Sequence, residues 1–231
     1  MKKVLIIGGS TDIGLSLAKY LIDNDYKVLL TYYKNKIVLD SIPTIKCDVT
    51  DEVSIENTIK YGLNLFDNID ILINLAAISL DNSFLNKTKE EFLSVLNVNL
   101  VGTFLTNQIY SRYIDNGLII NISSTDGIDT YSQYNIDYSA SKAGIINMTK
   151  SISLCTNNKV LCICPNWIDS MTTSGMNKDY LNSELKRIKQ SRLITLDEFT
   201  RSVYEIINTT YDTGSIIRMD IKDGNLWLKK I

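Results

Sequence analysis

The stretch Ile7-Gly8-Gly9-Ser10-Thr11-Asp12-Ile13-Gly14 decides the fold. It follows the apolar run 4–7 and passes directly into a segment with helical periodicity. A glycine-rich turn between a strand and a helix lets backbone N–H groups and the positive helix end approach a phosphate group. Glycines also serve ordinary strand-to-helix turns, so the turn by itself indicates a nucleotide site without establishing it.

Outward from this turn, short β-branched runs alternate with segments of helical period along the whole chain. Strands are expected at residues 4–7, 28–32, 69–74, 118–123 and 160–164. Helices are expected at residues 13–23, 51–63, 89–113, 138–155 and 197–209, with Thr50 as the N-cap of the second. Because the strands are apolar on both faces, they favour a parallel sheet covered by helices. The pattern predicts one doubly wound α/β domain over residues 1–231.

The composition excludes several classes of function. The chain of 231 residues has no histidine, which removes Ser-His-Asp and Cys-His mechanisms and every metal site with a His ligand. The 24 Lys and Arg balance 26 Asp and Glu without long runs of one sign, so no nucleic-acid or membrane partner is expected. No apolar stretch approaches the roughly 20 residues that span a bilayer.

The four cysteines and the first residues of the chain indicate the cellular compartment in which the protein is expected. The cysteines include no C-x-x-C pair, and a zinc site made of all four is formally open although its spacing matches no common arrangement. Nothing that resembles a signal peptide opens the chain. Reduced thiols and a cytoplasmic location are the expectation.

Six segments in order resemble the motifs of the short-chain dehydrogenase/reductase family, over about residues 3–220. After the glycine turn come Cys47-Asp48-Val49, Asn74-Leu75-Ala76-Ala77, Asn99 within Asn97-Val98-Asn99, Asn121-Ile122-Ser123-Ser124, Tyr138-Ser139-Ala140-Ser141-Lys142 and Pro165-Asn166-Trp167-Ile168-Asp169-Ser170. The chain departs from the family pattern at Ile7, Asp12, Leu75, Ala77 and Asn166. The resemblance implies a Rossmann-like, mostly parallel, seven-stranded sheet that binds NAD(P).

The resemblance also implies which residues hold the cofactor. They are Gly8, Ser10, Thr11, Asp12, Ile13, Gly14, Tyr32, Lys34, Asp48, Val49, Asn74, Ala76, Tyr138, Lys142, Pro165, Ile168 and Ser170. The carboxylate of Asp12 must point away from the phosphates or cap the helix, while Asn166 replaces a glycine and tolerates an unusual backbone. Tyr32 stands where members that use NAD have an Asp, and Lys34 and Lys36 follow it, which favours NADP(H) over NAD(H). A solvated basic loop would have the same composition.

A Tyr followed by a Lys four residues later carries little information by itself. The chain has 13 Tyr, so about one such pair arises by chance, and two occur, Tyr32 with Lys36 and Tyr138 with Lys142. Only Tyr138 and Lys142 fall on a predicted helix, where residues four apart are neighbours. Their context among the other motifs selects them.

Reduction of a ketone requires a proton at oxygen, which a free phenol with a pKa of about 10 supplies poorly near neutral pH. Lys142 and an oxidised nicotinamide together would lower the pKa of Tyr138 by about three units, or roughly 4 kcal/mol. Ser124 ends a predicted strand and would polarise the substrate carbonyl, with Ser123 as the alternative. By resemblance, Lys142 also holds the ribose, and Asn99 bends its helix and completes a proton relay.

The sequence thus predicts an NAD(P)(H)-dependent oxidoreductase that interconverts a small-molecule ketone and a secondary alcohol. The resemblance extends to 3-oxoacyl thioester reductases, but the substrate stays open. The alternative is a catalytically inactive NAD(P)-binding regulatory or structural protein, which the departures at Asp12 and Asn166 motivate. A sugar-nucleotide epimerase is disfavoured, because the chain lacks residues for a second substrate domain.

Other parts of the chain are expected to cover the substrate site or to form contacts between subunits. Residues 170–191 are polar and carry Gly175, which suits either a segment that covers the substrate or a plain surface loop. A homotetramer or homodimer is implied by resemblance, with Leu93, Leu96, Leu100 and Phe104 either on a partner helix or on the sheet. The tail after Gly224 is expected to pack on a neighbouring subunit.

Overall fold

The computed structural model describes residues 1–35 and 42–231, which form one mixed sheet with helices on both faces. The strands are β1 (Lys3–Ile7), β2 (Lys27–Tyr32), β3 (Thr44–Lys46), β4 (Ile71–Asn74), β5 (Leu118–Ile122), β6 (Lys159–Pro165), β7 (Ile216–Lys222) and β8 (Asn225–Lys230). The helices are α1 (Asp12–Asp23), α2 (Glu52–Phe66), α3 (Lys89–Leu96), α4 (Gly102–Tyr113), α5 (Ile136–Ile152), α6 (Met171–Ser174), α7 (Lys178–Arg187) and α8 (Leu196–Asn208). A π-helical turn, η1 (Asn97–Val101), joins α3 to α4, and a short 3-10 turn, η2 (Thr125–Gly127), follows β5.

The strand order β3-β2-β1-β4-β5-β6-β7-β8 confirms the doubly wound class. Every neighbouring pair from β3 to β7 is parallel, whereas β7 and β8 pair antiparallel. The order reverses between β1 and β4, and in open α/β sheets ligands bind beyond the carboxyl ends of the strands at such a point. The glycine turn follows β1, so the fold places it at this crevice.

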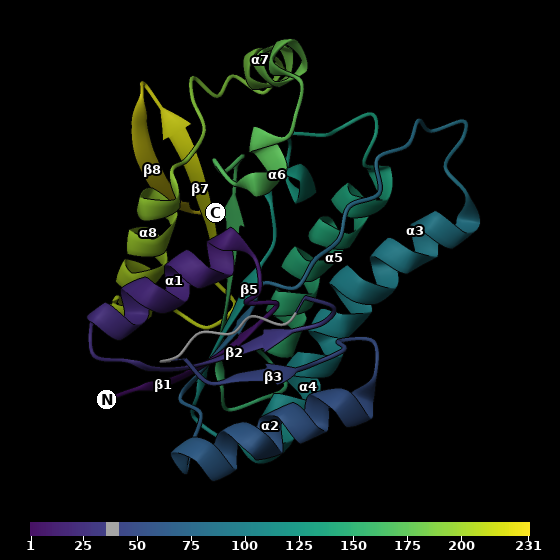
Figure 1. The fold of residues 1–231 in the computed structure, drawn as a ribbon. Helices are drawn as coiled ribbons and strands as arrows, with labels where there is room; N and C mark the ends of the chain where they lie inside the picture. Colours follow the sequence, from purple (N-terminus) through teal and green to yellow (C-terminus); the bar gives the residue numbers. More distant parts are fainter. Residues whose placement is uncertain (36–41) are drawn as a thin grey trace.

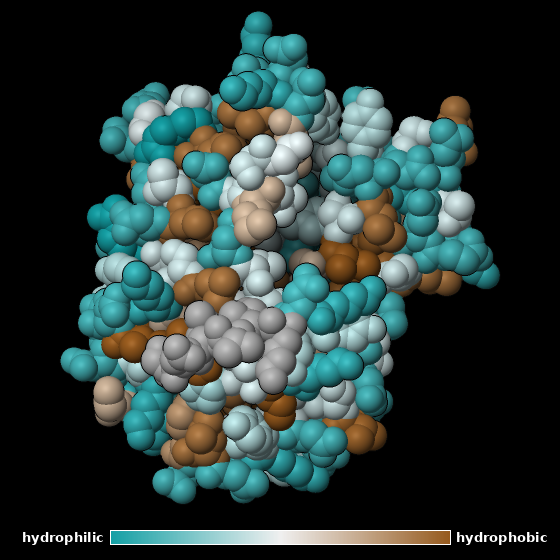
Figure 2. Space-filling view, viewed as in Figure 1, coloured by the Kyte–Doolittle hydropathy of each residue, from teal (hydrophilic) through white to brown (hydrophobic). Residues whose placement is uncertain are grey.

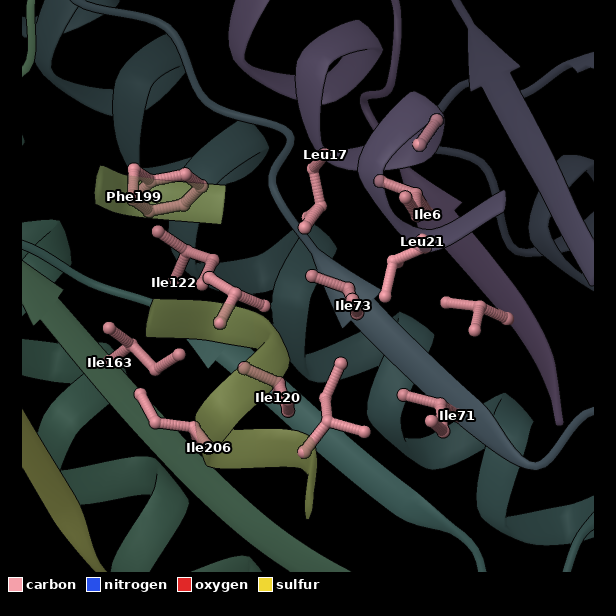
Figure 3. Packing of buried hydrophobic residues seen from close by; sticks show 14 of the residues in the cluster. Ile6, Leu17, Leu21, Ile71, Ile73, Ile120, Ile122, Ile163, Phe199 and Ile206 are labelled. Carbon is pink, nitrogen blue, oxygen red and sulfur yellow. The ribbon is translucent and has the colours of Figure 1, made fainter. Parts of the chain in front are cut away.

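Helices cover the two faces of the sheet unequally (Figure 1). Helices α1 and α8 lie on one face, and α2, α4 and α5 lie on the other. On the first face, Leu17 and Leu21 of α1 and Phe199 and Ile206 of α8 pack against Ile6, Ile71, Ile73, Ile120, Ile122 and Ile163 of the strands (Figure 3). All of these side chains are buried, and burying each stabilises the fold by roughly 1.5–3 kcal/mol.

The expected seven-stranded sheet is wrong by one strand. Gly224 has a φ of +78°. The residues after it fold back as β8, and Leu226 and Leu228 pack against the core. The left-handed turn at Gly224 allows this hairpin. The tail that was expected to pack on a neighbouring subunit therefore packs on its own sheet.

Two local expectations also change. Asp51, not Thr50, caps α2 by accepting a hydrogen bond from the Val53 amide, because the Thr50 hydroxyl instead donates to Asp48 at 2.7 Å. The segment at 170–191 is not irregular, since it contains α6 and α7.

None of the helices in residues 1–35 and 42–231 combines the length and the apolar character that crossing a bilayer requires.

Candidate active site

The glycine turn brings its backbone very close to the loop after β4. Gly8 has φ +80°, and a Cβ there would lie 2.5 Å from the backbone N and Cα of Ala76. Its amide donates to the Thr31 hydroxyl at 2.9 Å. At the other end, Thr11 caps α1 by accepting from the Gly14 amide at 3.2 Å. A side chain at Gly8 would thus clash and be strained, so the turn requires glycine there.

A cavity of about 530 Å³ opens beside this turn. Eight of the residues predicted to hold the cofactor line it: Gly8, Ser10, Thr11, Tyr32, Lys34, Asp48, Val49 and Ala76. Its volume suits a nucleotide, and the cradle at Gly8 leaves backbone groups free to approach a phosphate. Lys36 lies outside the described residues.

Asp48 and Lys34 give this cavity its charged groups. The Asp48 carboxylate accepts from the Thr50 amide at 2.9 Å and from the Thr50 hydroxyl at 2.7 Å. Burial acts to raise the pKa of Asp48, but these hydrogen bonds outweigh it and the pKa is lowered, so the carboxylate is ionised near neutral pH. The Lys34 ammonium lies 5.6 Å from the Tyr33 ring centroid, and its side chain is exposed at the mouth of the cavity.

The remaining predicted cofactor residues do not line this cavity. They are Asp12, Ile13, Gly14, Asn74, Tyr138, Lys142, Pro165, Ile168 and Ser170. Asn74 instead donates to the Asn121 side chain at 2.9 Å in the interior, while Ser170 caps α6.

Asp12 is the departure from the family pattern with the clearest structural consequence. Its carboxylate accepts a hydrogen bond from the Met171 amide at 2.6 Å, across 159 residues of sequence. The side chain therefore points to the start of α6 and does not cap its own helix, which Thr11 caps. Asp12 ties the glycine turn to the segment that was expected to cover the substrate.

The three predicted catalytic side chains come together at the end of β5. Tyr138 and Lys142 lie one turn apart on α5, with the Lys142 ammonium 5.3 Å from the Tyr138 ring centroid. The Ser124 side chain lies near enough to Tyr138 to act on the pKa of its phenol. Ser123 points elsewhere, because its hydroxyl donates to the backbone oxygen of Lys142 at 2.7 Å. This arrangement supports Ser124 over Ser123.

Burial and nearby charges act on the pKa values of Tyr138 and Lys142. Burial raises the pKa of Tyr138, the negative charge of Asp126 raises it further, and the Ser124 side chain only partly opposes them. Burial also lowers the pKa of Lys142 to about 8, and its ammonium donates to the Ile122 carbonyl at 2.8 Å. The pKa of Tyr138 is thus raised overall, and the joint effect of Lys142 and an oxidised nicotinamide on it stays a prediction. Protonated Tyr138 is the form that donates a proton in ketone reduction.

Asn99 sits in the π-helical turn η1, where a bend was expected. Its side chain accepts from the Ile78 amide at 2.8 Å and donates to the Ile78 carbonyl at 2.9 Å and to Ser141 at 3.1 Å. Asn99 therefore joins the loop after β4 to α5. Its part in a proton relay stays a prediction.

Sequence reasoning missed two acidic residues beside the cluster. Asp126 is 6% exposed and lies two residues after Ser124. Asp137 is fully buried, accepts from the Tyr138 amide at 2.9 Å and pairs with the Lys87 ammonium at 2.9 Å. Their proximity in sequence to Ser124 and Tyr138 was a signal, but their burial depends on distant elements.

The expectation for Asn166 is wrong. It is not among the described residues with positive φ, so its backbone is not of the kind that favours glycine. Its side chain donates to Asp220 on β7 at 3.0 Å and accepts from the Trp167 amide at 2.9 Å. The amide thus joins the end of β6 to β7.

The surface between α6 and α5 is hollowed in the view of Figure 2. Helix α5 borders this region, and α6 and α7 lie beyond it (Figure 1).

Comparison with known proteins identifies relatives along the whole chain. A family model described as short chain dehydrogenase matches residues 2–181. The chain is 33% identical to carbonyl reductase family member 4 of Xenopus laevis over 99% of both chains. It is 30% identical to the 3-oxoacyl-(acyl-carrier-protein) reductase FabG of Chlamydia pneumoniae over 87% of both. A solved structure of ElxO with NADP bound superposes with a TM-score of 0.78 at 26% identity, covering 94% of this chain and 96% of that one.

Proposed function

The chain belongs to the short-chain dehydrogenase family and is an NAD(P)-dependent oxidoreductase; from that premise we propose that Tyr138 exchanges the proton as a ketone and a secondary alcohol interconvert. The observation that carries the proposal is the Lys142 ammonium 5.3 Å from the Tyr138 ring centroid on α5, beside Ser124 at the end of β5.

The chain's own residues would divide the chemistry as follows. When bound, the cofactor supplies or removes hydride at the carbonyl carbon. The Ser124 oxygen accepts from the Asp126 amide at 3.1 Å, which leaves the Ser124 hydroxyl to donate to the carbonyl oxygen. Tyr138 gives its phenolic proton to the same oxygen during reduction and takes it back during oxidation. Lys142 would hold the ribose.

NADP(H) is the proposed cofactor. Tyr32 and Lys34 line the cavity where an acid would favour NAD(H), and Lys34 supplies a cation for the 2′-phosphate. The similar ElxO structure contains NADP. The Asp12 carboxylate, which is held by Met171, points toward α6 and so need not meet the phosphates.

A 3-oxoacyl thioester is one substrate to test, because similar proteins carry the name 3-oxoacyl-(acyl-carrier-protein) reductase. The chain's similarity to carbonyl reductase family member 4 supports a wider set of small ketones. The substrate is therefore proposed as a small-molecule carbonyl or alcohol.

A homotetramer or homodimer in the cytoplasm is the proposed state. Leu93 is 50% exposed and Phe104 is 41% exposed on the outer side of α3 and α4, which supports a partner at this face. Leu100 instead packs inward on the cluster around Ile145. The four free thiols support a reducing compartment.

The test is consumption of NADPH or NADH by the purified protein with a panel of ketones and 3-oxoacyl thioesters, with Tyr138→Phe as the background. We expect ketone-dependent oxidation of NADPH that the variant lacks. Tight cofactor binding with no turnover above the variant's rate would instead favour a cofactor-binding regulatory or structural protein.

A further inference from the structure

The carboxylate of Asp126 lies at the candidate active site but has no role in the reaction proposed above. It lies in η2, directly after the strand end that carries Ser124, and is 6% exposed. The turn packs tightly on α5, since a Cβ on Gly127 would lie 2.6 Å from the Ala143 amide nitrogen. Asp126 is therefore held against the helix that carries Tyr138 and Lys142.

Only one of the two carboxylate oxygens has a partner. Asp126 Oδ1 accepts from the Thr130 hydroxyl at 2.7 Å. Within residues 1–35 and 42–231, no donor is bonded to Oδ2. Asp126 Oδ2 is not fully buried, so it is open as an acceptor to a donor that is not part of the chain.

The surrounding charges do not supply that partner. Tyr138 and Lys142 face Asp126 from α5, and Glu184 and Arg187 face it from α7. Lys142 donates to the Ile122 carbonyl, and Arg187 directs its Nε and Nη2 to Glu184 at 2.7–3.1 Å. Neither cation bonds to the Asp126 carboxylate.

Without a hydrogen-bond donor on it, the Asp126 carboxylate disfavours the loss of the proton from Tyr138. Its negative charge disfavours a tyrosinate at Tyr138 and raises the pKa of that phenol. A hydrogen-bond donor placed on Asp126 would weaken this repulsion. Recognition of such a donor would thus assist the ionisation that Tyr138 undergoes during turnover.

We propose that Asp126 Oδ2 accepts a hydrogen bond from the substrate, and that the substrate is a ketone with a hydroxyl or ammonium group beside the carbonyl. The inference rests on the proposed function and narrows its substrate class. A ketone with only apolar neighbours would bury the acceptor unpaired, which lowers kcat/KM by about tenfold or more.

The test compares three ketones with the same number of heavy atoms: butanone, hydroxyacetone and aminoacetone. We expect the wild type to prefer hydroxyacetone or aminoacetone over butanone by about tenfold or more in kcat/KM, and Asp126→Leu to abolish that preference. Asp126→Asn preserves the shape without the charge and should reduce the preference for aminoacetone more than that for hydroxyacetone. The order of the two donor-bearing ketones distinguishes a hydroxyl from an ammonium substrate.

Asp129→Asn is the matched control, because this nearby carboxylate is 53% exposed and pairs with Arg218. It should leave the preference unchanged. Circular dichroism establishes that each variant is folded. If Asp126→Leu is unfolded, the substrate preference of Asp126→Asn alone tests the proposal.

Three results would overturn the inference. Tyr138-dependent turnover without a preference for donor-bearing ketones, or with the same preference in Asp126→Leu and Asp126→Asn, refutes it and leaves the proposed function intact. Equal losses for all three ketones in Asp126→Leu and Arg187→Met would show that Asp126 only holds α7. No Tyr138-dependent turnover of any ketone would overturn both proposals.

Discussion

The buried ion pair between Lys87 and Asp137 should dominate the stability of the region around Tyr138. Their side chains are 3% and 0% exposed, the charged atoms are 2.9 Å apart, and Lys87 also donates to the Leu80 carbonyl. Removing one member of a buried pair leaves the other charge without its partner, which costs about 3–5 kcal/mol. For a chain of this size, that lowers Tm by about 6–20 °C.

Lys87→Met and Asp137→Asn each test this expectation by urea denaturation and thermal unfolding. The double variant should recover a large part of the loss, because it leaves no unpaired charge. The control is Lys60→Met, since Lys60 pairs with Glu56 at 3.0 Å while 52% exposed and should cost about 0.5 kcal/mol or less. Equal losses for Lys87→Met and Lys60→Met would refute the reasoning.

Three further predictions concern the cofactor, the covering segment and pH. Lys34→Ala should weaken NADPH binding about fivefold and leave NADH binding unchanged, measured by fluorescence titration; equal effects would argue against a 2′-phosphate contact. Asp12→Gly should speed tryptic cleavage after Lys178 about tenfold, because the bond to the Met171 amide is lost, whereas Asp12→Asn should not. Burial lowers the pKa of Lys142 from 10.5 to about 8, so the unfolded state binds more protons between these values and stability rises with pH there. The unfolding free energy of the wild type relative to Lys142→Met should therefore increase by about 2 kcal/mol from about pH 7 to about pH 9.5, and a constant difference would contradict the burial of a charged Lys142.

Local patterns in the sequence predicted β1, β2, β4, β5 and β6, because parallel strands are continuous apolar runs and the helices between them keep their period. They did not predict β3, which has three residues, or β7. The tail at residues 225–230 was not predicted to be a strand, because β8 is a partly exposed antiparallel edge strand with polar residues on it. The motifs also located Tyr138 and Ser124, since both lie at ends of regular elements. The bond between Asp12 and Met171 joins residues 159 apart, and no local pattern reports it.

The charges around Tyr138 were beyond sequence reasoning for a different reason. The pKa of a buried group depends on how much water the fold removes and on which charges it brings near. Asp126 acts on Tyr138 because η2 packs on α5, and Thr130 holds its carboxylate at 2.7 Å. Neither contact follows from the spacing of the motif.

Proton transfer by Tyr138 is tested most directly by single-turnover oxidation of NADPH with excess enzyme and a ketone that the wild type reduces. Tyr138→Phe should slow this step about 10²–10⁴-fold and leave the Kd for NADPH nearly unchanged. A variant that keeps the wild-type single-turnover rate would contradict the role of Tyr138 and the site built around it.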